Sequence, residues 1–211
     1  MKQCDHRALA RFLMREVGDR EIWRGRRRAL FFLGNLLPDY LPLTYLRGVR
    51  QSRGLRGHDR PYSEAYIRKS IRLLEGRAHL RGRDFYRLGS LLHYLADSFT
   101  FVHTEAFDGD LRAHRRYEWA LHRVMTAALE AGDAGQVSVE SCRTLWERAR
   151  AHHARALPRP ERDGYAILSV CRAVTERMVL REENFGNFKK PLDRSQKIRY
   201  TVTNQTDEEE E

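Results

Sequence analysis

Apolar residues recur at helical spacing over most of the chain, and this spacing predicts its elements. Leu9, Phe12, Leu13 and Val17 form one such stripe, and comparable stripes follow. We therefore expect helices over residues 5–17, 24–36, 63–75, 84–103, 111–131, 138–156 and 163–183. Because no segment alternates apolar and polar residues as a strand would, the predicted fold class is all-α, a multi-helix bundle.

Local signals set the expected helix ends. Asp5, Ser63 and Asp163 are predicted N-caps, because short polar side chains accept hydrogen bonds from the first turn. Pro38 is expected to end the second helix, since the residue before a proline avoids helical geometry. Residues 47–61 are rich in glycine and arginine and predict a loop of about fifteen residues.

The segment 89–118 carries the most informative polar residues. His93 and Asp97 are four residues apart, as are His114 and Glu118, so each pair lies on one face of a helix. Such pairs are common on helix surfaces, but His93 and Asp97 lie among leucines, where charged groups need partners or a metal. Imidazole and carboxylate ligands suit zinc, so we interpret the segment as a zinc site.

Two further residues extend this site. His103 is ten residues past His93, a rotation of about −80° on one continuous helix, so it is expected to face a second metal beside the first. Asp39 follows Pro38 within an apolar stretch that includes Leu36, Leu37 and Leu41. Two clusters of ligands are typical of a multi-metal phosphoesterase.

Composition adds a preference for anionic partners. The 211 residues carry a net charge of +10, although residues 207–211 are all acidic. Such a surface favours phosphate esters, nucleic acid or an anionic membrane. The three cysteines, Cys4, Cys142 and Cys171, are too few and too widely spaced for a disulfide framework, and reduced thiols are expected. Cys4, beside His6, is a weak candidate metal ligand.

The chain is expected to form one zinc-binding helical domain over residues 1–198, followed by a flexible acidic tail over 199–211. No apolar run is long enough to cross a membrane, and the first residues lack a secretory signal. The expected location is therefore cytoplasmic.

Taken in order, the ligand-type residues form a recognisable series: His6, Pro38–Asp39, His58, His93–Asp97, His103 and His114–Glu118. The series resembles the bacterial zinc-dependent phospholipase C family, whose fold and trinuclear zinc site are shared by fungal single-strand nucleases. The resemblance covers roughly residues 6–118.

The resemblance implies a ligand set. One zinc would take Asp39, His58, His93 and Asp97, and Asp97 would bridge to a neighbouring zinc that also takes His6. A third would take His103, His114 and Glu118, so two or three zinc ions are expected. Asp39 would orient or deprotonate the attacking water.

The sequence departs from the family at two places. The family's mature N-terminal tryptophan binds zinc through its amino and carbonyl groups, whereas here Met1 could serve only if its free amine folds back. In the family's choline pocket, Tyr40 matches the expected tyrosine. Leu55 stands where an aromatic residue is expected, and an acidic residue has no counterpart. Selectivity for choline is therefore not implied.

These observations predict a zinc-dependent phosphodiester hydrolase, phospholipase C-like, that uses zinc-activated water. One alternative is a nuclease for single-stranded nucleic acid, which would stack a base on an aromatic side chain. Another is a non-catalytic helical protein stabilised by zinc with a closed coordination shell.

Overall fold

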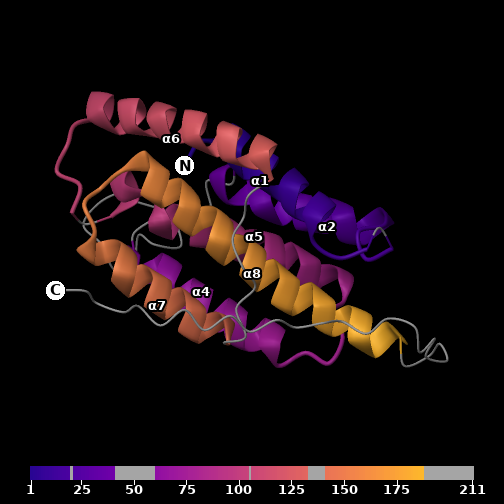
Figure 1. Cartoon of the computed structure of the whole chain (residues 1–211). Coiled ribbons are helices and arrows are strands. Elements are labelled where there is room, and N and C mark those ends of the chain that lie inside the picture. The colour runs from indigo at the N-terminus through magenta and orange to yellow at the C-terminus, as the bar shows by residue number, and fades with distance from the viewer. Residues whose placement is uncertain (20, 41–59, 105, 133–140, 188–211) are drawn as a thin grey trace, which may run out of the picture.

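A computed structural model describes residues 1–19, 21–40, 60–104, 106–132 and 141–187 (Figure 1). Across these ranges the chain is helical and contains no strand, which confirms the predicted all-α class. The elements are α1 (Gln3–Glu16), α2 (Gly25–Tyr40), α4 (Arg60–Glu75), α5 (Gly82–Phe99), the 3₁₀ helix η1 (Phe101–His103), α6 (Leu111–Ala131), α7 (Cys142–Arg155) and α8 (Pro160–Asn187).

Helix α5 lies in the middle of the bundle and contacts α1, α2, α4, α7 and α8 (Figure 1). Leu88, Leu91, Leu92, Leu95 and Phe99 are all fully buried. A helix that is apolar around most of its circumference belongs in the interior, because any exposed face would leave apolar area in water. Polar residues on its inner faces, among them His93 and Asp97, are therefore enclosed by protein as well.

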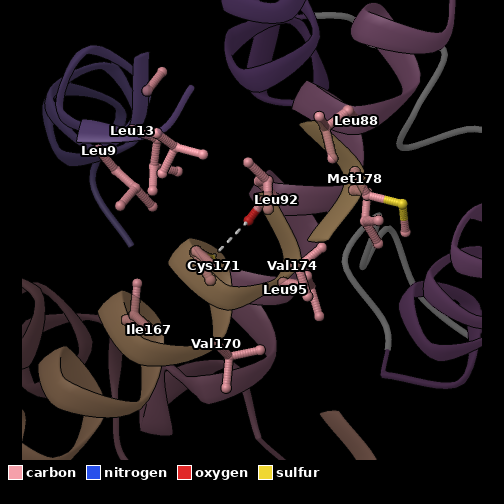
Figure 2. Close-up of a cluster of buried hydrophobic side chains, with 14 of the residues drawn as sticks. Leu9, Leu13, Leu88, Leu92, Leu95, Ile167, Val170, Cys171, Val174 and Met178 are labelled. Carbon is pink, nitrogen blue, oxygen red and sulfur yellow. Dashed lines mark hydrogen bonds between the residues drawn. The ribbon is translucent and has the colours of Figure 1, made fainter. Parts of the chain in front are cut away.

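The apolar core forms where α1, α5 and α8 meet (Figure 2). Leu9 and Leu13 of α1 lie in this core together with Leu92 of α5 and Val174 of α8. Burying each such side chain stabilises the fold by about 1.5–3 kcal/mol. The thiol of Cys171 donates to the Leu92 carbonyl over 3.8 Å, and burial raises its pKa, so it stays protonated. Cys4, Cys142 and Cys171 are all free thiols in the structure.

Two glycines bring α2 against α5. A Cβ at Gly34 would collide with the Tyr86 carbonyl, and a Cβ at Gly89 would collide with the Phe31 carbonyl. The two backbones are thus in direct contact, as only glycine permits. This contact sets the end of α2 beside the polar residues of α5.

The expectation that Pro38 ends α2 is wrong, because the helix continues to Tyr40 with Pro38 in its last turn. A proline there cannot donate to the carbonyl four residues earlier. That carbonyl, on Gly34, instead accepts from the Ser90 hydroxyl of α5 at 3.1 Å. Packing against α5 thus compensates for the lost helical bond and carries α2 on to Asp39.

The three predicted N-caps are also wrong. Helix α1 begins after Lys2, α4 begins at Arg60, and α8 begins at Pro160, where the fixed φ of proline suits a first helical turn. Asp5 and Asp163 lie inside their helices and bind side chains of other elements. Helix α7 begins at Cys142, not at residue 138, and its N-cap is Ser141.

Several expectations lie outside the described residues. Most of the predicted loop over 47–61 belongs to the range 41–59, and the acidic tail and its boundary at residue 198 fall within 188–211. The division into a domain and a tail therefore stays a prediction. Among the described helices, none has the length and apolarity needed to span a membrane.

Candidate metal centre

The predicted ligands that the structure describes converge where α1, α2, α5, η1 and α6 meet. They come from five separate elements: His6 from α1, Asp39 from α2, His93 and Asp97 from α5, His103 from η1, and His114 and Glu118 from α6. Residues spread over more than one hundred positions of the chain thus form one polar cluster.

Asp97 is the centre of this cluster. Its Oδ1 lies 2.9 Å from the Met1 amine, 3.2 Å from His6 Nε2 and 3.4 Å from His103 Nδ1. Its Oδ2 lies 3.4 Å from His93 Nε2. Through Oδ1 the carboxylate contacts both His6 and His103, and through Oδ2 it contacts His93, so it lies between the two groups of ligands, as a bridging ligand would.

One group of ligand atoms consists of His6, Asp39 and His93, within 4.8 Å of one another. His93 Nε2 lies 3.4 Å from Asp39 Oδ1, and the His6 and His93 rings stack with centroids 3.9 Å apart. His93 Nδ1 lies 3.0 Å from the Asn35 carbonyl oxygen, and donation to it would aim Nε2 at the carboxylates. Metal-binding histidines are typically oriented in this way.

The second group consists of His103, His114 and Glu118. Glu118 Oε1 lies 3.6 Å from Nε2 of both histidines, whose rings stack at 5.3 Å. The expected continuous helix through His103 is wrong, because α5 ends at Phe99 and Thr100 is extended. His103 reaches Asp97 and Glu118 from the 3₁₀ turn that follows, so the rotation calculated for one helix does not apply.

The spacing of these atoms fits zinc. Zinc bonds of about 2.0–2.2 Å to nitrogen and oxygen place two tetrahedral ligands roughly 3.3–3.6 Å apart. The histidine–carboxylate distances here are 3.2–3.6 Å. His6 is completely buried, and among the described residues neither of its ring nitrogens makes a hydrogen bond. A buried imidazole with no hydrogen bond is costly unless a ligand such as a metal ion satisfies it.

The α-amino group of Met1 lies in the same cluster. Besides Asp97, it lies 3.3 Å from both Glu118 Oε1 and His103 Nε2. The amine thus folds back into the cluster, as it must if it is to stand in for the family's N-terminal tryptophan. Metal binding needs the neutral amine, so it would release a proton.

Charge in the cluster is balanced locally. Burial alone would raise the pKa of Asp97, but the Met1 ammonium, His103, His6 and His93 together hold that pKa well below its usual range. Burial likewise opposes ionisation of Glu118, yet the hydrogen bond from His103 and the nearby Met1 ammonium lower its pKa to about 2. Both carboxylates are therefore ionised at neutral pH, as metal ligands must be.

Two of the residues expected at the site cannot be placed. His58 lies outside the described residues, and of Tyr40 only the backbone, in the last turn of α2, is described. The Asn35 carbonyl, beside His93 Nδ1, was not among the site groups predicted from the sequence. Asn35 lies four residues before Asp39, on the same face of α2, and that spacing was the available signal.

No curated protein and no solved structure matches the chain significantly. A family model, that of zinc-dependent phospholipase C, matches residues 5–159. The matched region contains each predicted ligand from His6 to Glu118 and extends through α7. Because the match covers well over half of the 211 residues, the chain belongs to the zinc-dependent phospholipase C family.

Proposed function

We propose that this chain is a zinc-dependent hydrolase of phosphodiesters, with a phospholipid as its substrate. The observation that carries the proposal is the position of Asp97, which joins two histidine–carboxylate groups within the region that matches the family.

The residues that would hold zinc fall on the two sides of Asp97. His6, Asp39 and His93 are on one side, and His103, His114 and Glu118 are on the other. These groups would supply ligands for two or three ions, and the Met1 amine is a further donor. Bound zinc supplies Lewis acidity toward phosphate oxygens and lowers the pKa of water to about 7.

Asp39 is the proposed general base. It lies in the last turn of α2, where the contact between α2 and α5 fixes the backbone, and its side chain is 15% exposed. It is therefore held beside His93 while remaining accessible to water. A carboxylate in this position can orient a water molecule and accept its proton.

The site is open on the side of α6. His114 and Glu118 are 28% and 19% exposed, in contrast to the buried His6 and His93. A purely structural zinc site closes its coordination with protein ligands. Partial exposure favours an enzyme over the non-catalytic alternative.

The outer face of α6 suits an anionic lipid surface. Arg112, Arg116, Trp119 and Arg123 recur at helical spacing and are exposed, Trp119 by 59%. Tryptophan favours the membrane interface, and each basic residue adds about 1 kcal/mol of attraction to anionic lipid. Because Glu118 precedes Trp119, this face would bring the site close to lipid headgroups.

The test is hydrolysis by the purified chain with zinc, after chelation, and after zinc is restored. We expect release of the phosphorylated headgroup from phospholipid vesicles, loss of turnover with chelator, and recovery with zinc. Single-stranded DNA and RNA serve as comparison substrates. Zinc binding without turnover of any phosphodiester would favour the non-catalytic alternative, and turnover of nucleic acid alone would favour a nuclease.

A further inference from the structure

A third set of ligand-type side chains lies beside the candidate centre and shares no residue with it. Cys4 and Asp5 come from α1, and His122 comes from α6. Cys4 Sγ lies 3.6 Å from Asp5 Oδ1 and 3.8 Å from His122 Nδ1. Asp5 Oδ1 lies 2.5 Å from His122 Nδ1.

The packing of α1 against α6 explains why this set exists. The amine of Met1 meets Glu118 at 3.3 Å. Four residues further along each segment, Asp5 of α1 meets His122 of α6. Because a turn of α6 advances by about 5.4 Å, the two contacts lie at distinct positions along that helix.

The carboxylate of Asp5 supplies an independent reason to expect a ligand. Asp5 is only 2% exposed, and its Oδ2 makes no hydrogen bond to any described residue. The contact with His122 satisfies only Oδ1. Leaving a carboxylate oxygen buried and unsatisfied is costly, and a cation bound by both carboxylate oxygens would remove that cost.

The donor atoms suit a thiophilic divalent metal. Zinc bonds of about 2.3 Å to sulfur and about 2.0–2.2 Å to nitrogen or oxygen separate such ligands by roughly 3.6 Å. Both distances from Cys4 Sγ agree with this value. The Oδ1–Nδ1 distance is shorter, as in a hydrogen bond, so the 30% exposed imidazole of His122 would turn aside by about 1 Å.

We propose that Cys4, Asp5 and His122 form an additional binding site for zinc or a similar divalent metal. The thiol would transfer its proton to solvent as the metal–sulfur bond forms, and water would complete the coordination. A metal bound there would fasten the first turn of α1 to α6. Because Met1 and His6 flank that turn, the additional metal would also steady two donors of the candidate centre.

The experiment replaces zinc by Co²⁺ in the full chain and records absorption in the near ultraviolet. A thiolate bound to cobalt gives a charge-transfer band, whereas nitrogen and oxygen ligands do not. The described donor atoms of the candidate centre are nitrogen and oxygen, and none of them is a thiolate. We expect the band in wild type, its loss in Cys4→Ser, and a decrease of one equivalent of zinc in that variant.

Matched controls separate this site from the other thiols and from the proposed activity. Cys142→Ser should keep the band, because Cys142 is a buried thiol, and His114→Ala should keep it while losing metal from the candidate centre. If Cys4→Ser does not fold, as judged by circular dichroism, the same measurement is made on His122→Gln. The charge-transfer band of that variant should shift or weaken.

Absence of the band in cobalt-loaded wild type would overturn the proposal and leave Asp5 and His122 as an ion pair. Persistence of the band in Cys4→Ser would also overturn it. Neither result depends on turnover, so failure of the proposed hydrolase and failure of this metal site are distinguishable.

Discussion

Two buried aspartates show how differently one chain can satisfy a carboxylate. Asp163 of α8 accepts from the Phe101 amide at 2.7 Å and from the Tyr117 hydroxyl at 2.8 Å through Oδ2, while Oδ1 lies 2.7 Å from His153 Nε2. Each contact has the length of a good hydrogen bond. Asp163 thus links α8 to η1, α6 and α7.

Asp97 has similar neighbours at different distances. Its Oδ1 accepts a hydrogen bond from the Met1 amine at 2.9 Å, but its contacts with His6, His93 and His103 are longer, at 3.2–3.4 Å. His93 also lies near Asp39, and His103 also lies near Glu118. Hydrogen bonding accounts for Asp163, whereas the spacing around Asp97 fits ligands arranged about metal ions. The comparison shows what separates a structural polar network from a candidate metal centre. The lengths of the contacts, and whether each buried donor and acceptor atom has a hydrogen bond, distinguish the two better than residue type does.

The largest effect that tests this contrast is expected from Asp97→Asn. The amide keeps the shape but loses the negative charge that faces both ligand groups, so most of the zinc should be lost and turnover should be abolished. Elemental analysis and the vesicle assay measure the two effects.

Asp163→Asn is the matched control, because it removes the same charge from the other network. It should retain its zinc while melting at a lower temperature. Full zinc content in Asp97→Asn would show that Asp97 does not hold the metals.

The next effect concerns Asp39, which we place at the metal centre as a base. Asp39→Asn should keep most of the zinc, since His6, His93 and Asp97 remain and the amide oxygen still ligates weakly. Turnover should fall by about 10² to 10⁴, as expected when a general base is lost. Zinc content and the rate of hydrolysis of bis-nitrophenyl phosphate are measured on the same preparation. Undiminished turnover at full zinc content would remove Asp39 from the mechanism.

The sequence predicted the helices well because their apolar periodicity is strong, and α6 spans the predicted residues 111–131. Asp110 caps its start, and Gly132, with φ of 74°, ends it, as glycine with positive φ commonly does. Two of the wrong starts had one cause: Asp5 and Asp163 have the side chains of N-caps, but both are used in contacts between helices. Local sequence carries no information about such distant partners.

The candidate site was partly predictable, because some of its ligands form local patterns in the sequence. The i,i+4 pairs His93–Asp97 and His114–Glu118 are local patterns, and the structure sets each pair on one helix. The pairing of Asp5 with His122 joins residues 117 positions apart and depends on how α1 packs on α6. No spacing along the chain signals it, so it required the structure.

The smallest effect is expected from Tyr117→Phe, which removes a single hydrogen bond to Asp163. Burial and the Asp163 carboxylate raise the pKa of Tyr117, so its hydroxyl stays protonated and donates at neutral pH. Because the acceptor is a charged carboxylate, its loss should cost about 1.5–3 kcal/mol of unfolding free energy. For a chain of this size that is a fall of roughly 3–12 °C in Tm, with no change in zinc content or turnover.

The fall should be equal with and without chelator, because the Asp163 network does not depend on metal, and zinc content should not change. Tm is measured by circular dichroism for wild type and variant in both conditions. If chelation removes the difference between the two proteins, the Asp163 network is coupled to metal binding. The division between a structural network and a metal centre would then be wrong, and η1, which Asp163 holds at Phe101 and which carries His103, would be the connection between them.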